Sequence, residues 1–308
     1  MKNKSIGGSL CLTLAALLWG STFVAQEVNT VGSFTFQGVR SMVGALFLLV
    51  LIAIITAIKK AKGTYVKPTK EDNKNLILGG VACGLVLCLS MNLQQFGIAL
   101  GSEAGKAGFI TAMYILLVPV YGLFAHKKVG LRIWGCIAIA VAGLFLLCID
   151  LSKIGSGTGM SICIGDVFVM LCAFSFALHI ITVDKFVDKV DGVKLSLMQF
   201  VVAGTISLVL MFIFEQPTVS GIVKGAFPIL YAGICSSGIA YTLQIVGQKN
   251  TPAVIASLLM SLESVFAVLT QIAVMGRLPS LQEAIGCIVM FAAIIIAQLP
   301  DKKVKTNE

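Results

Sequence analysis

The sequence predicts an all-α membrane protein with ten transmembrane helices in two inverted five-helix repeats. Composition is the first observation: 57% of the 308 residues are hydrophobic, 12% are charged, and the mean hydropathy is +0.98. Such a chain has too little polar surface to cover a soluble globule. Its apolar residues also gather in stretches of about 20, enough for a helix to cross a bilayer core of about 30 Å. Finally, the second half of the chain repeats motifs of the first.

Ten apolar stretches follow one another along the chain, separated by short connections. The expected spans are 8–26, 34–58, 75–99, 103–125, 131–149, 164–186, 193–214, 226–247, 252–275 and 281–299. Three helix starts carry capping signals, which are Thr69 before the third span, Thr251 with Pro252 before the ninth, and Ser280-x-x-Glu283 before the tenth. The short connections leave no room for a soluble catalytic or nucleotide-binding domain.

Two pairs of motifs, half a chain apart, indicate the internal repeat. Leu93-Gln94-x-x-Gly97 recurs as Leu243-Gln244-x-x-Gly247 at an offset of 150 residues, and Gly135-Cys136-Ile137 recurs as Gly286-Cys287-Ile288 at 151. Because five is an odd number, the second set of spans must cross the membrane in the opposite direction. The expected organisation is a first repeat at 1–150, a linker at 151–163, a second repeat at 164–300 and a tail at 301–308.

The distribution of basic residues predicts the orientation. Cytoplasmic loops of membrane proteins retain Lys and Arg. With the N-terminus inside, 18 of the 23 basic residues fall on the cytoplasmic side, four fall outside and Arg40 lies within a span. Both termini are therefore predicted to be cytoplasmic. Topology and contact with the lipid bilayer account for the net charge of +9, so no nucleic-acid partner is expected.

Metal and cofactor chemistry are not expected. The nine cysteines lie in or beside apolar stretches without a Cys-x-x-Cys pair, which favours a packing role over zinc or disulfides. The chain also lacks a Gly-x-x-x-x-Gly-Lys-Ser/Thr phosphate loop, so it is not expected to hydrolyse ATP itself. Facilitated diffusion and exchange with an ion, such as a proton, remain as driving forces.

Three segments resemble the two EamA domains of the drug/metabolite transporter superfamily. They are AALLWGSTFVAQ at 15–26, LLVPVYG at 116–122 and SLESVFAV at 261–268, the last with Ser264 where the family normally has proline. The resemblance covers nearly the whole chain. It implies a ten-helix secondary transporter of the bacterial plasma membrane with a central cavity. It favours export of amino-acid-like metabolites, with organic phosphates or drug-like compounds as alternatives.

Three ionisable residues within spans are the leading candidates for binding substrate or a coupling ion. Glu263 lies near the middle of the ninth span, where a carboxylate costs about 2.5–3.5 kcal/mol. We expect it to be a proton site, a counter-charge for a cationic substrate group, or both, the alternative being a structural partner for Arg40 or a backbone contact. Arg40 itself is expected to pair inward. Lys106, in the fourth span, either faces Glu263 across a site for a zwitterion, reaches the interface, or pairs with Glu103.

Uncharged side chains within the spans complete the candidate site. Trp19 and Tyr114 are expected to line an aromatic cavity or to pack. The amides of Asn92, Gln94 and Gln244 are expected to bind substrate or to join helices, and His179 to relay protons or to be a satisfied core residue. Pro119 breaks the hydrogen-bond ladder of the fourth span and predicts a hinge there, with Ser264 as its counterpart in the second repeat.

Two other functional classes compete with a transporter. An intramembrane enzyme needs catalytic groups at a recognisable spacing, which His126 and His179 do not have. A non-transporting scaffold has no use for a deep charge such as Glu263. The sequence therefore predicts a transporter that moves a small-molecule substrate by alternating access around a midplane site. A homodimer is one alternative for its oligomeric state.

Overall fold

The computed structural model describes residues 2–27, 29–102, 104–124, 129–149, 163–276 and 278–299. The expected tail and all but the last residue of the expected linker lie outside these ranges. Within them, nine helical segments are long and apolar enough to cross a membrane, and a tenth, Leu131–Leu147, is slightly shorter. These ten segments coincide with the ten expected spans, which confirms the predicted fold class.

Most spans are single helices, whereas the fourth, eighth and ninth are built from two or three helical segments each. The elements are α1 (Lys2–Glu27), α2 (Ser33–Ala61), α3 (Lys70–Ala99), α4 (Ala104–Ala112), α5 (Tyr114–Phe124), α6 (Leu131–Cys148), α8 (Ile164–Phe186), α9 (Gly192–Phe214), α10 (Val219–Lys224), α11 (Ala226–Tyr231), the π-helix η1 (Ala232–Ala240), α12 (Tyr241–Gln248), α13 (Ala253–Met260), α14 (Glu263–Met275) and α15 (Leu281–Gln298). Short α10 lies between the seventh and eighth spans, where no helix is predicted.

Two of the three predicted helix caps are confirmed. The Thr69 side chain accepts a hydrogen bond from the backbone N–H of Asp72, whose carboxylate accepts one in return, and Ser280 forms the same capping box at α15. The prediction for Thr251 is wrong. Pro252 has an extended ψ of 143° and itself precedes the first helical residue, so the helix begins one residue later and has no side-chain cap.

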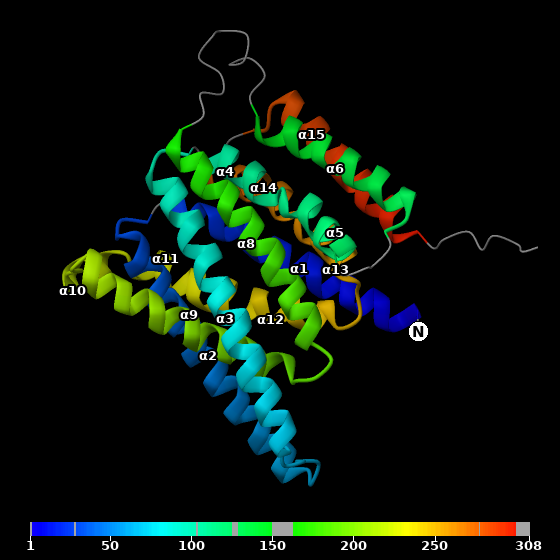
Figure 1. Ribbon diagram of the computed structural model, residues 1–308. Coiled ribbons are helices and arrows are strands. Elements are labelled where there is room, and N and C mark those ends of the chain that lie inside the picture. Colours follow the sequence, from blue (N-terminus) through cyan, green and yellow to red (C-terminus); the bar gives the residue numbers. More distant parts are fainter. Residues whose placement is uncertain are drawn as a thin grey trace, which may run out of the picture.

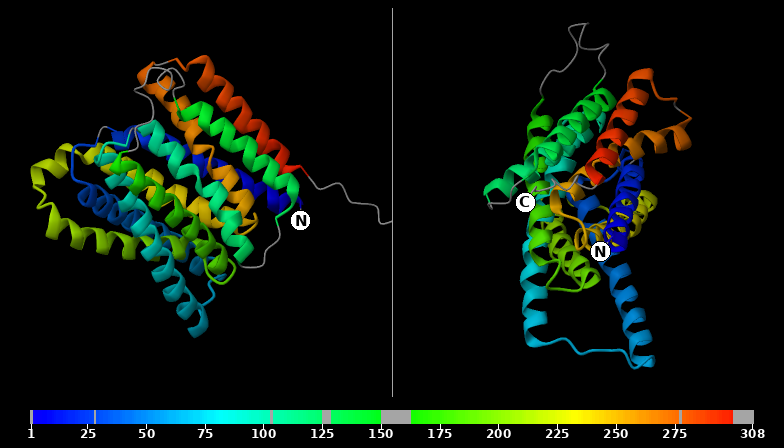
Figure 2. Two further views of the ribbon diagram at one scale, coloured as in Figure 1. Left: turned by 45° about the horizontal axis from the view of Figure 1, so that its top comes forward. Right: turned by 90° about the vertical axis from the view of Figure 1, so that its right-hand side faces the viewer.

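The packing of the helices follows the two-fold relation between the repeats. α2 packs against α9 and α6 against α15, so the second and fifth spans of each repeat contact their own counterparts. α3 packs on α8, and the matching segments η1 and α12 pack on α1. Figure 1 shows α6 and α15 side by side along one edge of the molecule. In both views of Figure 2, α1 begins close to where α15 ends, as expected for an even number of spans.

The glycines of the repeated Leu-Gln-x-x-Gly motif form two equivalent close helix crossings. A Cβ atom on Gly97 would lie 2.8 Å from the backbone oxygen of Gly165 on α8. A Cβ atom on Gly247 would lie 2.9 Å from the backbone oxygen of Gly8 on α1. Both distances are too short for any side chain larger than hydrogen, so the motif repeats because both crossings require it.

We expect Gly97→Ala to destabilise the protein by about 1–3 kcal/mol, because the added methyl group meets the backbone of α8, which cannot shift independently. Thermal unfolding of the detergent-solubilised protein measures the effect. Gly135→Ala is the matched control, since Gly135 belongs to the other repeated motif and a Cβ atom there has nothing within 4 Å. Equal melting temperatures for the two variants would contradict the role of Gly97.

A carboxylate of the second repeat caps the helix that carries Arg40. Glu215, at the end of α9, accepts hydrogen bonds from the backbone N–H of Phe34 at 2.8 Å and of Thr35 at 2.7 Å, and from the Thr35 hydroxyl at 2.8 Å. The first N–H groups of a helix have no acceptor within it, and the helix dipole favours an anion there. Glu215 therefore fixes the start of α2 about two turns before Arg40.

The predicted orientation can be tested at two exposed lysines. Lys67 lies between α2 and α3, and Lys224 ends α10 at the opposite end of the bundle (Figure 1). We expect a cysteine at position 67 to react with a membrane-impermeant maleimide only from the cytoplasmic side, and a cysteine at position 224 to react in intact cells. The reverse pattern would overturn the orientation.

Candidate substrate-binding cavity

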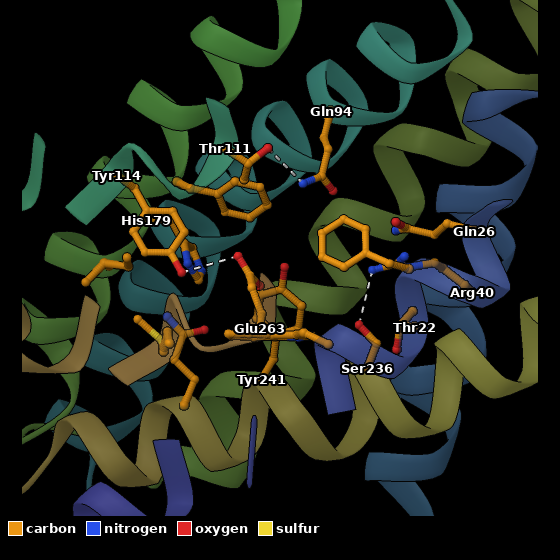
Figure 3. Close-up of a pocket in the computed structure, with 16 residues that line it drawn as sticks. Thr22, Gln26, Arg40, Gln94, Thr111, Tyr114, His179, Ser236, Tyr241 and Glu263 are labelled. Carbon is orange, nitrogen blue, oxygen red and sulfur yellow. Dashed lines mark hydrogen bonds between the residues drawn. The ribbon is translucent and has the colours of Figure 1, made fainter. Parts of the chain in front are cut away.

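Seven of the nine predicted binding residues line one cavity between the repeats. They are Trp19, Arg40, Gln94, Tyr114, His179, Gln244 and Glu263. Seven of the ten spans contribute to the lining, because the residues come from α1, α2, α3, α4, α5, α8, η1, α12, α13 and α14. The cavity volume is about 50 Å³. Figure 3 shows the labelled side chains converging on it from different helices.

Two helix interruptions bring Tyr114 and Glu263 together. The fourth span is interrupted at Met113 and the ninth at 261–262. The N–H groups of Met113 and Leu262 bond to the carbonyl three positions earlier, instead of the four of an α-helix. Tyr114 is the first residue of α5, and Glu263 is the first residue of α14. The Tyr114 hydroxyl donates a hydrogen bond to Glu263 Oε1 at 3.3 Å across a separation of 149 residues. This separation is close to the repeat offset, so the two side chains occupy matching places in the repeats.

Pro119, the predicted hinge, lies inside α5 and not at the interruption. The interruption is six residues earlier, and the matched pair across the repeats is Tyr114 with Glu263 rather than Pro119 with Ser264. Proline has no N–H, so it leaves the carbonyl of Ile115 without its helical donor. The segment 113–119 therefore has fewer helical hydrogen bonds than the rest of the span, and a hinge at Pro119 stays a prediction.

Glu263 is buried at the start of a half-helix. Its side chain is 8% exposed, and its position in the first turn of α14 places the carboxylate where the helix dipole favours negative charge. α1 packs closely behind it, since a Cβ atom on Gly20 would lie 2.6 Å from the backbone oxygen of Glu263. The Glu263 side chain is thus confined from behind and extends toward the cavity and Tyr114 (Figure 3).

Arg40 supplies positive charge to the other side of the cavity. Its side chain is 3% exposed, Nη2 donates a hydrogen bond to Ser236 Oγ at 3.4 Å, and the guanidinium lies 5.5 Å from the centre of the Phe36 ring. Nε and Nη1 are buried without a hydrogen-bond partner in the described part of the chain. A buried cation with unused donors is costly unless an anion or water meets them.

The alternative of a structural ion pair between Arg40 and Glu263 is not seen. In the ranges that the structure describes, the hydrogen bond of Glu263 comes from Tyr114 and that of Arg40 goes to Ser236. Figure 3 places these two groups on different sides of the cavity. Within the described residues, the cavity therefore presents a carboxyl group and a guanidinium group that are not bonded to each other.

A π-helix shapes the wall beside Arg40. The nine residues of η1 lie in the eighth span, and a Cβ atom on Gly233 would lie 2.9 Å from the backbone oxygen of Arg40. Ser236, within η1, receives the hydrogen bond from the guanidinium. π-Helical turns are rare and occur often at functional sites, because they widen the helix and redirect side chains. Here the wide turn brings Ser236 to the Arg40 guanidinium.

Three of the neutral candidates, Trp19, His179 and Gln244, each have a buried polar atom without a hydrogen-bond partner among the described residues. Gln244 Nε2 donates to Gln248 Oε1 at 3.0 Å, and Oε1 of Gln244 has no partner. His179 Nε2 lies 3.0 Å from Gln199 Oε1, and Nδ1 has no partner. The indole N–H of Trp19 is also unpaired. Buried polar atoms normally have hydrogen-bond partners, so these three atoms mark places for water or for polar groups of a ligand.

Two predicted site residues do not contribute a described side chain to the cavity. Asn92 Nδ2 donates to the backbone oxygen of Cys88 at 2.8 Å and to Ser207 Oγ at 2.9 Å, so it joins α3 to α9. Joining helices is the alternative that the sequence left open for this amide. Lys106 belongs to α4, but its side chain and Glu103 lie outside the described residues, so its role stays a prediction.

Sequence reasoning misses Tyr241, which forms the aromatic wall of the cavity. Its ring centre lies 4.8 Å from that of Trp19, 5.3 Å from that of Phe200 and 6.0 Å from that of His179. Tyr241 lies three residues before Gln244, on the same helical face, and this spacing was the available signal. The same spacing links Trp19 to further lining residues of α1. The cavity is also lined by Thr22, Phe23, Gln26, Thr111, Phe176, Ile180, Ser236, Tyr241 and Met260.

Comparison with known proteins identifies the family. The model of the EamA-like transporter family matches residues 6–149 and 163–298. An uncharacterized transporter of Archaeoglobus fulgidus is 25% identical over 302 residues, covering 96% of this chain and 87% of the relative. One of Clostridium kluyveri is 22% identical over 303 residues, covering 96% and 94%. A solved crystal structure of a protein shares the fold, with a TM-score of 0.75 and 17% identity over 94% of this chain and 96% of that chain. Because the family model matches both repeats, this chain belongs to the EamA-like transporter family and is a membrane transporter.

Proposed function

We propose that this protein is a secondary transporter of small zwitterionic, amino-acid-like metabolites. The observation that carries the proposal is the pair of opposite charges, Arg40 and Glu263, which line one buried cavity without forming an ion pair. Guanidinium groups bind carboxylates through charge-assisted hydrogen bonds, and two nitrogens of Arg40 have no partner among the residues that the structure describes. Glu263 offers an anion to the ammonium group of the same substrate.

The rest of the lining suits the remainder of such a molecule. Trp19, Tyr114 and Tyr241 surround the space near the two charges, and aromatic rings accept apolar side chains. The cavity of about 50 Å³ has room for only a few water molecules, at about 10–15 Å³ each. A substrate therefore needs the cavity to widen, and the interruptions at Met113 and at 261–262 are the places where the surrounding helices can bend.

The proposed cycle is alternating access between the two repeats. Discontinuous helices that meet at a central site are typical of transporters with inverted repeats, where the repeats rock around a fixed binding site. Glu263 can also exchange a proton, which would couple transport to the proton gradient. We propose export as the direction, since the resemblance to the family favours it.

Counterflow in proteoliposomes tests this function. Vesicles loaded with an unlabelled amino acid should take up the same labelled compound, whereas the N-acetyl derivative and the carboxamide should exchange at least tenfold more slowly, because each lacks one charge. Equal exchange of all three compounds would contradict a zwitterion site. Faster exchange of a phosphorylated metabolite than of any amino acid would assign the organic-phosphate alternative instead.

A further inference from the structure

A second cavity lies at the end of the bundle where α2 and α3 are joined. Its volume is about 490 Å³, and it is lined by the ends of α2 and α3, their connecting loop, the connection from α8 to α9, and Lys249. In the right-hand view of Figure 2 the ends of α2 and α3 stand apart, and the loop crosses between them. None of its lining residues lines the cavity of Arg40 and Glu263, so this is a separate place in the molecule.

The outer part of this second cavity has an excess of basic residues. Its lining includes five lysines and three aspartates: Lys59, Lys67, Lys189, Lys194, Lys249, Asp72, Asp188 and Asp191. Two of the aspartates already bind backbone N–H groups. Asp72 caps α3 by accepting from Thr69 at 2.8 Å, and Asp191 caps α9 by accepting from Val193 at 3.0 Å and from the next residue at 3.1 Å. The five lysines of the lining therefore outnumber its three carboxylates, two of which already cap helices.

The inner part of the second cavity is apolar. Ile52, Ile55 and Leu76 line it. The neighbouring surface of α2 and α3 is lipid-facing, since large apolar side chains there, such as Ile54 at 52% and Ile77 at 55%, are exposed. A free inorganic anion makes no use of an apolar inner wall. A cavity that is cationic outside and apolar inside matches an anion that carries acyl chains.

α2 and α9 pack side by side, and the end of this pair that lies far from the second cavity shows what an anion does between them. There Glu215 of α9 binds the first turn of α2 and ties the repeats together. At the lysine-rich end, the first turn of α9 is capped by its own Asp191, and the end of α2 contributes Lys59 rather than a carboxylate. The protein supplies the anion at one end of the α2–α9 pair and a cationic cavity at the other.

We propose that the second cavity binds the phosphate headgroup of an anionic phospholipid. Basic pockets between transmembrane helices at the membrane surface bind such headgroups, because several ammonium groups converge on one phosphate while the chains stay in lipid. The bound lipid bridges α2 and α3 of the first repeat to the α8–α9 connection of the second. It therefore stabilises the folded protein, whatever substrate the transporter carries.

The test measures thermal unfolding of the purified full-length protein in detergent with added lipid. Phosphatidylglycerol should raise the melting temperature saturably by several degrees, and phosphatidylcholine or millimolar inorganic phosphate should not. The double variant Lys67→Gln, Lys189→Gln removes two exposed lysines of the cavity and should weaken the apparent affinity for phosphatidylglycerol at least fivefold. Lys62→Gln, Lys74→Gln is the matched control, because these exposed lysines are near by but do not line the cavity.

Each remaining outcome overturns the proposal in a distinct way. An equal loss of the phosphatidylglycerol response in both double variants would assign it to general surface charge. Stabilisation by inorganic phosphate alone would assign the cavity to a soluble anion, and an equal response to phosphatidylcholine would exclude headgroup recognition. Lys67→Arg, Lys189→Arg keeps the charge and should keep the response, which separates loss of binding from loss of folding.

Discussion

Glu263→Gln is expected to abolish the pH dependence of transport while leaving the protein folded and inserted. Glutamine has nearly the same shape as glutamate and can still accept the hydrogen bond from Tyr114, so the contact between the two half-helices survives. It cannot take up a proton. In the wild type, protonation of Glu263 removes the negative charge that holds the ammonium group, so substrate affinity falls as the pH is lowered. Counterflow measured between pH 5 and pH 8 should therefore vary for the wild type and stay flat for the variant.

Tyr114→Phe is the matched control for this prediction. It removes the hydroxyl that donates to Glu263 but keeps the titratable carboxylate, so exchange should remain pH-dependent with a displaced midpoint. Both variants change one polar group of the same contact, and only one removes the proton site. Transport by Glu263→Gln that still varies with pH would place the titrating group elsewhere and contradict the assignment.

The positions of the spans are predictable because hydropathy depends on the sequence alone. The sixth span is expected at 164–186, and α8 is Ile164–Phe186; the seventh is expected at 193–214, and α9 is Gly192–Phe214. The repeat is also predictable from the sequence, because Gly97 and Gly247 must each admit another helix backbone at close range and are therefore glycine in both halves. What the pattern cannot supply is the course of the backbone inside a span. Apolar residues continue on both sides of Met113 and of 261–262, so hydropathy does not mark the interruptions there.

The depth of a charged residue in the membrane is also easier to predict than the direction in which its side chain points. The sequence shows that Arg40, Lys106 and Glu263 lie within spans, and their cost in lipid marks all three as candidates. Which of them share a cavity depends on the rotation of each helix about its axis, and that is set by packing. The structure brings Arg40 to the cavity of Glu263, although the sequence paired Glu263 with Lys106 as the charges of a zwitterion site. Tyr241 is missed for a similar reason, because an aromatic residue in an apolar stretch is equally typical of lipid contact, packing or a cavity.

Arg40→Gln is expected to cause a selective loss of carboxylate substrates. A hydrogen bond to a charged group contributes about 1.5–3 kcal/mol, which corresponds to roughly a ten- to hundredfold loss of affinity. Arg40→Lys keeps the charge but not the planar set of donors, so its loss should be intermediate. The measurement compares counterflow of an amino acid with that of its carboxamide, which has no carboxylate for Arg40 to bind.

The selectivity of that loss shows whether Arg40 binds the substrate carboxylate or only supports the fold. If Arg40 binds the carboxylate, the substitution weakens exchange of the acid, and the slow exchange of the amide stays at its wild-type level. If Arg40 only supports the fold through Ser236 and Phe36, the cavity changes shape for every ligand, and acid and amide decline together. Ser236→Ala provides the comparison, because it removes the hydrogen bond from Nη2 while the guanidinium remains. A loss in Ser236→Ala as large and as selective as in Arg40→Gln would show that position rather than charge is limiting. Because Nε and Nη1 of Arg40 keep their place in the cavity without Ser236, we expect Ser236→Ala to have a smaller effect than Arg40→Gln.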